Sequence, residues 1–148
     1  MKQEEKQLLL KDLCARLPYG VIVKFDGYWV REDCTLNVRH LSSTYSIEYL
    51  RMKPYLRPMS SMTEEEAKEI AILHGIKDIL SVKITDEYIE VVVDDGVCST
   101  ERRTIWYDEI ISSIEIFDWL NEHHFDVRHL IEKNLAIKVT EENNPYKD

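Results

Sequence analysis

The stretch LSVKITDEYIEVVVDDGVCSTERRTIWY, residues 80–107, decides the fold class of this chain. Apolar and polar residues alternate from 80 to 84, which is typical of a half-buried strand. Tyr88–Val93 is rich in β-branched residues and predicts a second strand. A turn is expected at the DDG sequence of residues 94–96, and Val97–Tyr107 can supply a third strand. We therefore predict an antiparallel meander.

Helix signals flank this meander on both sides. Thr63 followed by Glu66 forms a capping box and predicts a helix over residues 63–74, which ends near Gly75. After the meander, Ser113 can cap a helix that runs to His124. Asp126 can cap a second short helix, which we expect from Val127 to Lys133 and which Asn134 can end in the left-handed conformation.

The first fifty residues predict one helix followed by strands. Residues 2–16 form an amphipathic pattern, with Leu9, Leu13 and Arg16 in the inward stripe beside Leu10 and Cys14, while Asp12 faces water. Pro18 ends this helix, and a strand follows at Tyr19–Phe25. The Asp26-Gly27 pair predicts a hairpin turn. Further strand candidates are Tyr28–Arg31, Thr35–Leu41, Tyr45–Leu50 and, near the end of the chain, Leu135–Val139.

These elements together predict an α+β protein. It has an N-terminal helix, antiparallel sheet or sheets from residues 19–50 and 80–107, the central helix 63–74 and two short C-terminal helices. The two prolines of residues 53–62 indicate an irregular connection, either a structural plug or a site. We expect one compact domain over residues 1–140 and a frayed tail over 141–148.

The composition is that of a globular protein. Of the 148 residues, 44% are hydrophobic and 32% are charged, and the apolar runs are too short to span a membrane. The three cysteines (Cys14, Cys34 and Cys98) lie far apart without a metal or redox spacing, so we expect them to be thiols of the core. A reducing compartment suits this pattern, and we expect a cytoplasmic protein.

Charge is distributed unevenly along the chain. Residues 1–60 carry ten basic and seven acidic residues, a net of +3, whereas residues 61–148 carry nine and twenty-one, a net of −12. The two values sum to the net charge of −9. An acidic second half keeps the protein soluble and repels polyanions, while the first half can still hold a basic patch.

No recognised catalytic motif is present in the sequence. Its four scattered glycines form neither GxGxxG nor GxxxxGK, and neither GxSxG nor SxxK occurs. We therefore favour a protein that is not an enzyme, and we expect no cofactor and no metal. The alternative is a hydrolase or metal protein that uses His123, His124, Asp126 and His129, near Asp118 and Glu122. Adjacent histidines on a helix point about 100° apart, which argues against one shared ion.

The segment Arg39–Arg57 has the composition of a nucleic-acid site. Cations that hold phosphates, interleaved with aromatic faces that stack on bases, are typical of proteins that bind single strands. The candidate binding residues are Arg39, Arg51, Lys53, Tyr55 and Arg57, with His40, Tyr45 and Tyr49 between them. The other interpretation is that the tyrosines pack a sheet while the cations balance the acidic second half.

Three long blocks carry a resemblance that covers nearly the whole chain. They are LLLKDLCARLPYGV (Leu8–Val21), KPYLRPMSSMTEEE (Lys53–Glu66) and DWLNEHHFDVRHLIEKNLAI (Asp118–Ile137). In these blocks the chain resembles a family of small uncharacterised proteins of gut Bacteroides-type bacteria and of their phages and mobile elements. That family tends to have Gly where this chain has His129 and Asn134, which weakens the idea of a shared histidine site. The resemblance implies a compact cytoplasmic protein and implies no activity.

Our leading functional hypothesis is a non-enzymatic protein-binding module of phage or mobile-element origin. We expect a protein partner, no membrane partner, and we keep nucleic acid and a homo-oligomer as further options. The three tryptophans, Trp29, Trp106 and Trp119, are natural anchors for a partner where they are exposed.

Overall fold

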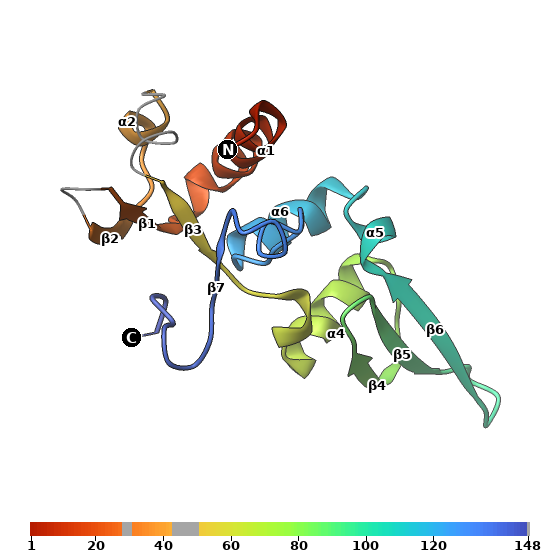
Figure 1. Cartoon of the computed structure of the whole chain (residues 1–148). Coiled ribbons are helices and arrows are strands. Elements are labelled where there is room, and N and C mark those ends of the chain that lie inside the picture. The colour runs from red at the N-terminus through yellow and green to blue at the C-terminus, as the bar shows by residue number, and fades with distance from the viewer. Residues whose placement is uncertain (28–30, 43–50, 148) are drawn as a thin grey trace. The chain divides into compact units, whose positions relative to one another are not determined.

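The chain has an α+β fold in a computed structural model that describes residues 1–27, 31–42 and 51–147 (Figure 1). Tyr45–Leu50, a predicted strand, lies outside these residues. The chain divides into two compact units, each described by itself below. The first unit comprises residues 1–57 and 121–148, and the second comprises residues 58–120. Among the described helices, none is long and apolar enough to cross a membrane.

Helix α1 (Gln3–Arg16) opens the first unit and confirms the predicted N-terminal helix. Its Leu9 and Leu13 are fully buried in the core of the unit. Leu10 and Cys14, predicted to lie beside this stripe, are exposed instead. The inward face is completed by charged side chains, because Asp12 and Arg16 are fully buried. Of the other cysteines, Cys98 is exposed and Cys34 is half-buried.

The sheet of the first unit has the strand order β2-β1-β3-β7. The first three strands pair antiparallel, whereas β7 pairs parallel with β3. The chain enters β1 later than predicted, because Pro18 starts a 3₁₀ turn (Leu17–Tyr19) and Gly20 takes the left-handed conformation at φ 67°. The strands are β1 (Ile22–Asp26), β2 (Arg31–Thr35), β3 (Lys53–Leu56) and β7 (Ile137–Lys138).

Strand β3 lies within a segment predicted to be irregular. Its Pro54 is tolerated because the missing N–H does not face β1. The backbone groups of Leu56 point to the same side of the strand as those of Pro54, because the two residues are two positions apart. Leu56 O accepts from Val139 N at 2.8 Å, so the backbone groups of both residues face β7. Pairing with β7 begins one residue later, at Tyr55, so Pro54 removes no ladder hydrogen bond.

Two other predicted elements of the first unit are wrong. The strand predicted over Thr35–Leu41 ends at Thr35, because the Asn37 side chain accepts from Arg39 N and His40 N and starts a helical turn, α2 (Val38–Leu41). Residues 127–133 form successive turns where a second short C-terminal helix is predicted. Asp126 does bind backbone N–H groups there, but those of Leu130 and Ile131, too far along to cap a first helical turn.

The second unit follows the predicted order closely. Thr63 Oγ1 accepts from Glu66 N and the Glu66 carboxylate accepts from Thr63 N, which confirms the capping box. The sheet has the order β4-β5-β6 and is antiparallel throughout. Its elements are a 3₁₀ turn (Met59–Ser61), α4 (Glu64–Leu73), β4 (Ile79–Ile84), β5 (Tyr88–Asp94), β6 (Thr100–Trp106), α5 (Tyr107–Ile110) and α6 (Ile114–Glu122), whose last two residues belong to the first unit.

One face of this sheet is buried and the other is outward. On β5 the inward side chains Ile89, Val91 and Val93 are buried, while the residues between them are half-buried. Strand β4 departs from the predicted alternation, because its register with β5 shifts between Ile79 and Ser81 and leaves Leu80 55% exposed.

Candidate functional site

The predicted nucleic-acid residues lie in the first unit but differ in their surroundings. Arg39 on α2 and Arg51, which has a φ of 46°, are exposed. Tyr55 is only 5% exposed, and its hydroxyl donates to both oxygens of the Asp33 carboxylate at 3.0 and 3.1 Å. Burial, followed by this hydrogen bond, raises the pKa of Tyr55. A ring held in this way supports the sheet and offers no open face for a base.

The other two cations of this set contact neighbouring parts of the first unit. Lys53 Nζ donates to Asn134 Oδ1 at 3.0 Å. The Arg57 guanidinium lies over the Phe125 ring, 4.2 Å from its centroid. These contacts join β3 to the segment that returns from the second unit, so Lys53 and Arg57 have structural roles in this arrangement.

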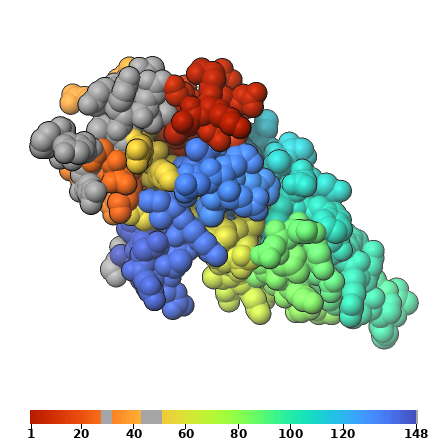
Figure 2. Space-filling view, in the orientation of Figure 1, coloured from red at the N-terminus to blue at the C-terminus, as the bar shows by residue number. Residues whose placement is uncertain are grey.

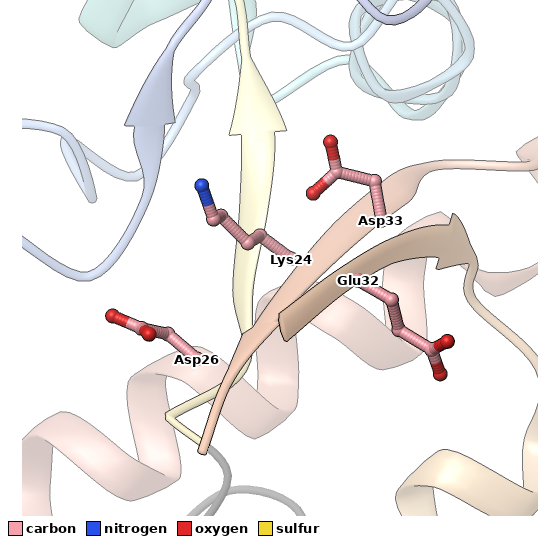
Figure 3. Close-up of a pocket in the computed structure, with 4 residues that line it drawn as sticks. All are labelled: Lys24, Asp26, Glu32 and Asp33. Atoms are coloured by element: carbon pink, nitrogen blue, oxygen red, sulfur yellow. The ribbon is translucent and has the colours of Figure 1, made fainter. Parts of the chain in front are cut away.

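A polar pocket of about 370 Å³ opens beside β1 and β2. Figure 3 shows the residues that line it, Lys24 and Asp26 from β1 and Glu32 and Asp33 from β2. Lys24 is paired directly across the sheet with Asp33, the same carboxylate that accepts the Tyr55 hydroxyl. The lining therefore combines three carboxylates with one ammonium group, and none of the four is a nucleophile of the Ser or Cys type.

The residues of the predicted histidine cluster have separate surroundings and do not form one site. His124 stacks on Tyr146, with ring centroids 3.9 Å apart and an interplanar angle of 8°. Asp126 accepts two backbone N–H groups, as described above, and exposed His129 takes a left-handed φ of 57°. Within residues 1–27, 31–42 and 51–147, no three His, Cys, Asp or Glu side chains lie close enough together to hold a metal ion.

Tyr146 holds the last described residues on the first sheet, although the sequence predicts a frayed tail there. Its hydroxyl accepts from Ile22 N at 3.1 Å and donates to Tyr55 O at 2.8 Å. It therefore bridges two adjacent strands where the β1–β3 pairing ends. Burial is the largest influence on this hydroxyl and raises the pKa of Tyr146 to about 12.

We expect His124 to make the stability of the first unit depend on pH. Burial, followed by the charges of Arg16, His123 and Arg57, lowers the pKa of His124 from 6.5 to about 4. The unfolded chain therefore takes up the proton first as the pH falls. The stability that neutral His124 contributes is complete above pH 6.5 and is lost as the pH falls towards 4.

Thermal melts of the wild type and of His124→Phe, between pH 7 and pH 4, test this expectation. Phenylalanine keeps a ring against Tyr146 and removes the titration. The melting temperature of the wild type should fall more steeply than that of the variant over this range. Parallel curves would contradict the assignment, because the carboxylates titrate in both proteins.

The second unit carries most of the exposed apolar side chains. Of the ten large hydrophobic side chains exposed in the part of the chain that the structure describes, seven lie between residues 58 and 120. They are Ile72, Leu73, Leu80, Val97, Trp106, Ile111 and Ile114. They are spread over α4, β4, the β5–β6 turn, the end of β6 and the segment from α5 to the start of α6, so each must be judged by its own neighbours.

Trp106 is the largest of these side chains, at 43% exposure, and lies at the end of β6. The register pairs it with Tyr88 on β5, and the two rings meet edge to face with centroids 5.0 Å apart. Val92 lies further along β5 on the same side of the sheet, because it is an even number of residues from Tyr88. We call this outward side, with Tyr88, Val92 and Trp106, the aromatic face.

Of the two proposed anchor tryptophans that the structure describes, Trp106 alone has this setting. Trp119 is half-buried, and its Nε1 donates to Glu69 Oε2 at 3.0 Å. Trp29 lies outside the described residues. The period of two along Val97–Tyr107 could have singled out Trp106, because it places this residue opposite the buried Ile105 side.

Comparison of the chain with known protein families, with curated proteins and with solved structures found no match.

Proposed function

We propose that this chain is a non-enzymatic, cytoplasmic protein-binding module of phage or mobile-element origin, and that the aromatic face of its second unit carries the binding surface. The observation that carries the proposal is the exposed Trp106, whose ring is supported by the Tyr88 ring, with the two centroids 5.0 Å apart. Tryptophan and tyrosine supply a large share of binding energy in protein interfaces. Two rings already in edge-to-face contact in the free protein lose little side-chain entropy on binding.

The charge of the second unit indicates the chemistry of the partner. Residues 58–120 contain fifteen acidic and five basic residues, a net of −10, whereas the rest of the chain has a net of +1. A field of this sign attracts a positively charged surface and repels nucleic acid. The partner we propose is therefore a protein with an apolar patch surrounded by Lys and Arg.

The test is capture of this partner from host lysate on the immobilised full-length chain, with nuclease and at two salt concentrations. Trp106→Ala should weaken binding of the captured protein by about tenfold or more. Val38→Ala is the matched control, because Val38 is 66% exposed but lies in the first unit. High salt should weaken the complex through its complementary charges.

Two outcomes would contradict the proposal. One is a captured protein that Trp106→Ala and Val38→Ala retain equally well. The other is recovery of nucleic acid that is released by high salt and by replacement of the exposed Arg39 and Arg51, which would favour the alternative of a single-strand binder.

A further inference from the structure

Strand β6 is an edge of the second sheet, and neither a bulge nor a proline interrupts it. It pairs with β5 in unbroken register from Thr100 to Trp106 and carries neither proline nor lysine. The opposite edge, β4, contains both a register shift and Lys83. Bulges, lysines and charges on the buried side are devices that prevent a sheet edge from pairing with another chain. Of these, β6 has only the charges, Glu101 and Arg103, which neutralise each other within one copy at 3.6 Å. Figure 2 shows the β5–β6 hairpin at the surface in this view.

The hydrogen bonds at both ends of the β5–β6 pair reveal which backbone groups point outward. Tyr107 N donates to Glu87 O at 3.1 Å, and Asp95 N donates to Ser99 O at 3.2 Å. In an antiparallel ladder, two facing residues that bond to each other through their backbone N–H and C=O groups recur at every second position. The odd-numbered residues of β6 therefore bond to β5. The outward N–H and C=O groups belong to Thr100, Arg102, Thr104 and Trp106, all of which are exposed.

The sequence of β6 is complementary to itself when read in the opposite direction. Residues 100–104 read Thr-Glu-Arg-Arg-Thr. In an antiparallel pair of two copies centred on Arg102, Glu101 of each copy lies opposite Arg103 of the other. Thr100 likewise lies opposite Thr104. Opposite charges and paired threonines are favourable cross-strand neighbours.

This register also satisfies the backbone. Thr100, Arg102 and Thr104 all have outward backbone groups, so each meets an outward group of the other copy and can exchange hydrogen bonds. Glu101 and Arg103 fall at the intervening positions, where facing Cα atoms are only about 4.5 Å apart and side chains interact most closely.

The two Arg102 side chains meet at the centre, and their repulsion is offset within each copy. Arg102 Nη1 lies 3.7 Å from Glu90 Oε1, so the centre of the pair would contain two guanidinium groups and two carboxylates. A register centred on Arg103 would instead place Arg103 opposite Arg103 of the other copy and Glu101 opposite Ile105 of the other copy. It would contain no cross-strand pair of opposite charges. Both registers place outward backbone groups opposite each other, so the centre at Arg102 is favoured by charge.

We propose that two copies of this chain associate through β6, antiparallel and centred on Arg102, so that their two second-unit sheets become one continuous sheet. This inference goes beyond the proposed function and does not depend on it. Its diagnostic residues, Glu101 and Arg103, lie on the side of the sheet opposite to Trp106.

Charge reversal is the first test, with the full-length chain and sedimentation equilibrium as the measurement. Glu101→Arg turns both cross-strand ion pairs into repulsive pairs and should weaken dimerisation by about tenfold or more. Arg103→Glu should have the same effect. The double variant Glu101→Arg/Arg103→Glu restores both pairs in the symmetric dimer and should recover most of the affinity.

Proline substitution is the second test, and it does not depend on charge. Thr104→Pro removes an outward N–H and leaves the bonds to β5 intact, so it should abolish dimerisation without unfolding the chain. Thr104→Val keeps the N–H and should remain dimeric. A chain that stays monomeric at the highest soluble concentration would overturn the proposal. So would a dimer that survives Thr104→Pro with its far-UV circular dichroism unchanged.

Discussion

Replacing Asp12 with alanine is expected to lower the free energy of unfolding of the first unit by about 3–5 kcal/mol. The Asp12 carboxylate accepts from Arg16 Nε at 2.7 Å, from Arg16 Nη2 at 3.1 Å and from Arg128 Nη1 at 3.0 Å. Asp12 and Arg16 are both fully buried. Without the carboxylate, the Arg16 guanidinium would keep only the Phe125 carbonyl, which it contacts at 2.6 Å, as an acceptor from this network.

Amide hydrogen exchange in β1 and β3 measures this loss, because it reports the stability of the first unit directly. We expect protection there to fall by a factor of about 10²–10⁴, which is the same free energy expressed as an equilibrium constant. Glu4→Ala is the control, because Glu4 is an exposed acid on the same helix. The double variant Asp12→Leu/Arg16→Met should be more stable than Asp12→Ala, since it removes the fully buried Arg16 charge together with its partner. Wild-type protection in Asp12→Ala would show that the network contributes little.

Phe125→Ala is expected to destabilise the first unit by a similar amount, about 3–5 kcal/mol, for a different reason. The Phe125 side chain is fully buried, so its removal leaves a cavity that the surrounding residues fill only in part. It also removes the ring beneath the Arg57 guanidinium. The backbone on either side of this ring joins the two parts of the first unit: Arg57 N donates to His124 O, and Asp126 N donates to Arg57 O, both at 2.8 Å.

Chemical denaturation followed by hydrogen exchange in β3 and β7 tests this prediction. Phe125→Leu is the matched control, because it keeps most of the apolar volume while it removes the aromatic face. It should cost clearly less than Phe125→Ala. If the two variants were equally unstable, the interaction between the guanidinium and the ring would outweigh the cavity.

Local signals made the second unit largely predictable from the sequence. The Thr63–Glu66 capping box, the left-handed Gly75 and the turn at Asp94–Gly96 each depend on residues within a few positions of one another. The DDG turn forms as expected, with Asp94 Oδ1 accepting from Gly96 N. The shift in β4 had no such signal, because a register shift depends on the partner strand.

The first unit was harder to predict because its contacts join residues distant in sequence. Asp12 has the helical spacing of the inward face but was predicted to face water because it is charged. Its buried network is completed by Arg128 and the Phe125 carbonyl, which lie more than a hundred positions away. Strand β3 was hidden by Pro54, which is harmless only because β7 begins pairing one residue further on. Tyr146 likewise finds its donor, Ile22 N, and its acceptor, Tyr55 O, 124 and 91 positions away along the chain.

The candidate sites show the same division between local and distant contacts. Basic and aromatic composition drew attention to Arg39–Arg57, but composition does not reveal that Tyr55 donates to Asp33 and that Lys53 donates to Asn134. The aromatic face could be anticipated from alternation alone once Trp106 and Tyr88 were assigned to neighbouring strands.

The bridge between Arg57 and Phe125 has a consequence for the order in which the protein matures on the ribosome. The whole second unit is synthesised between these two residues, so it can fold while the first is still missing β7. Until residues 125–128 emerge, the Asp12–Arg16 pair lacks the Phe125 carbonyl and Arg128. The nascent first unit therefore lacks these two contacts until the end of translation. A chain that is truncated after residue 120 should therefore have a folded second unit and a protease-sensitive first unit.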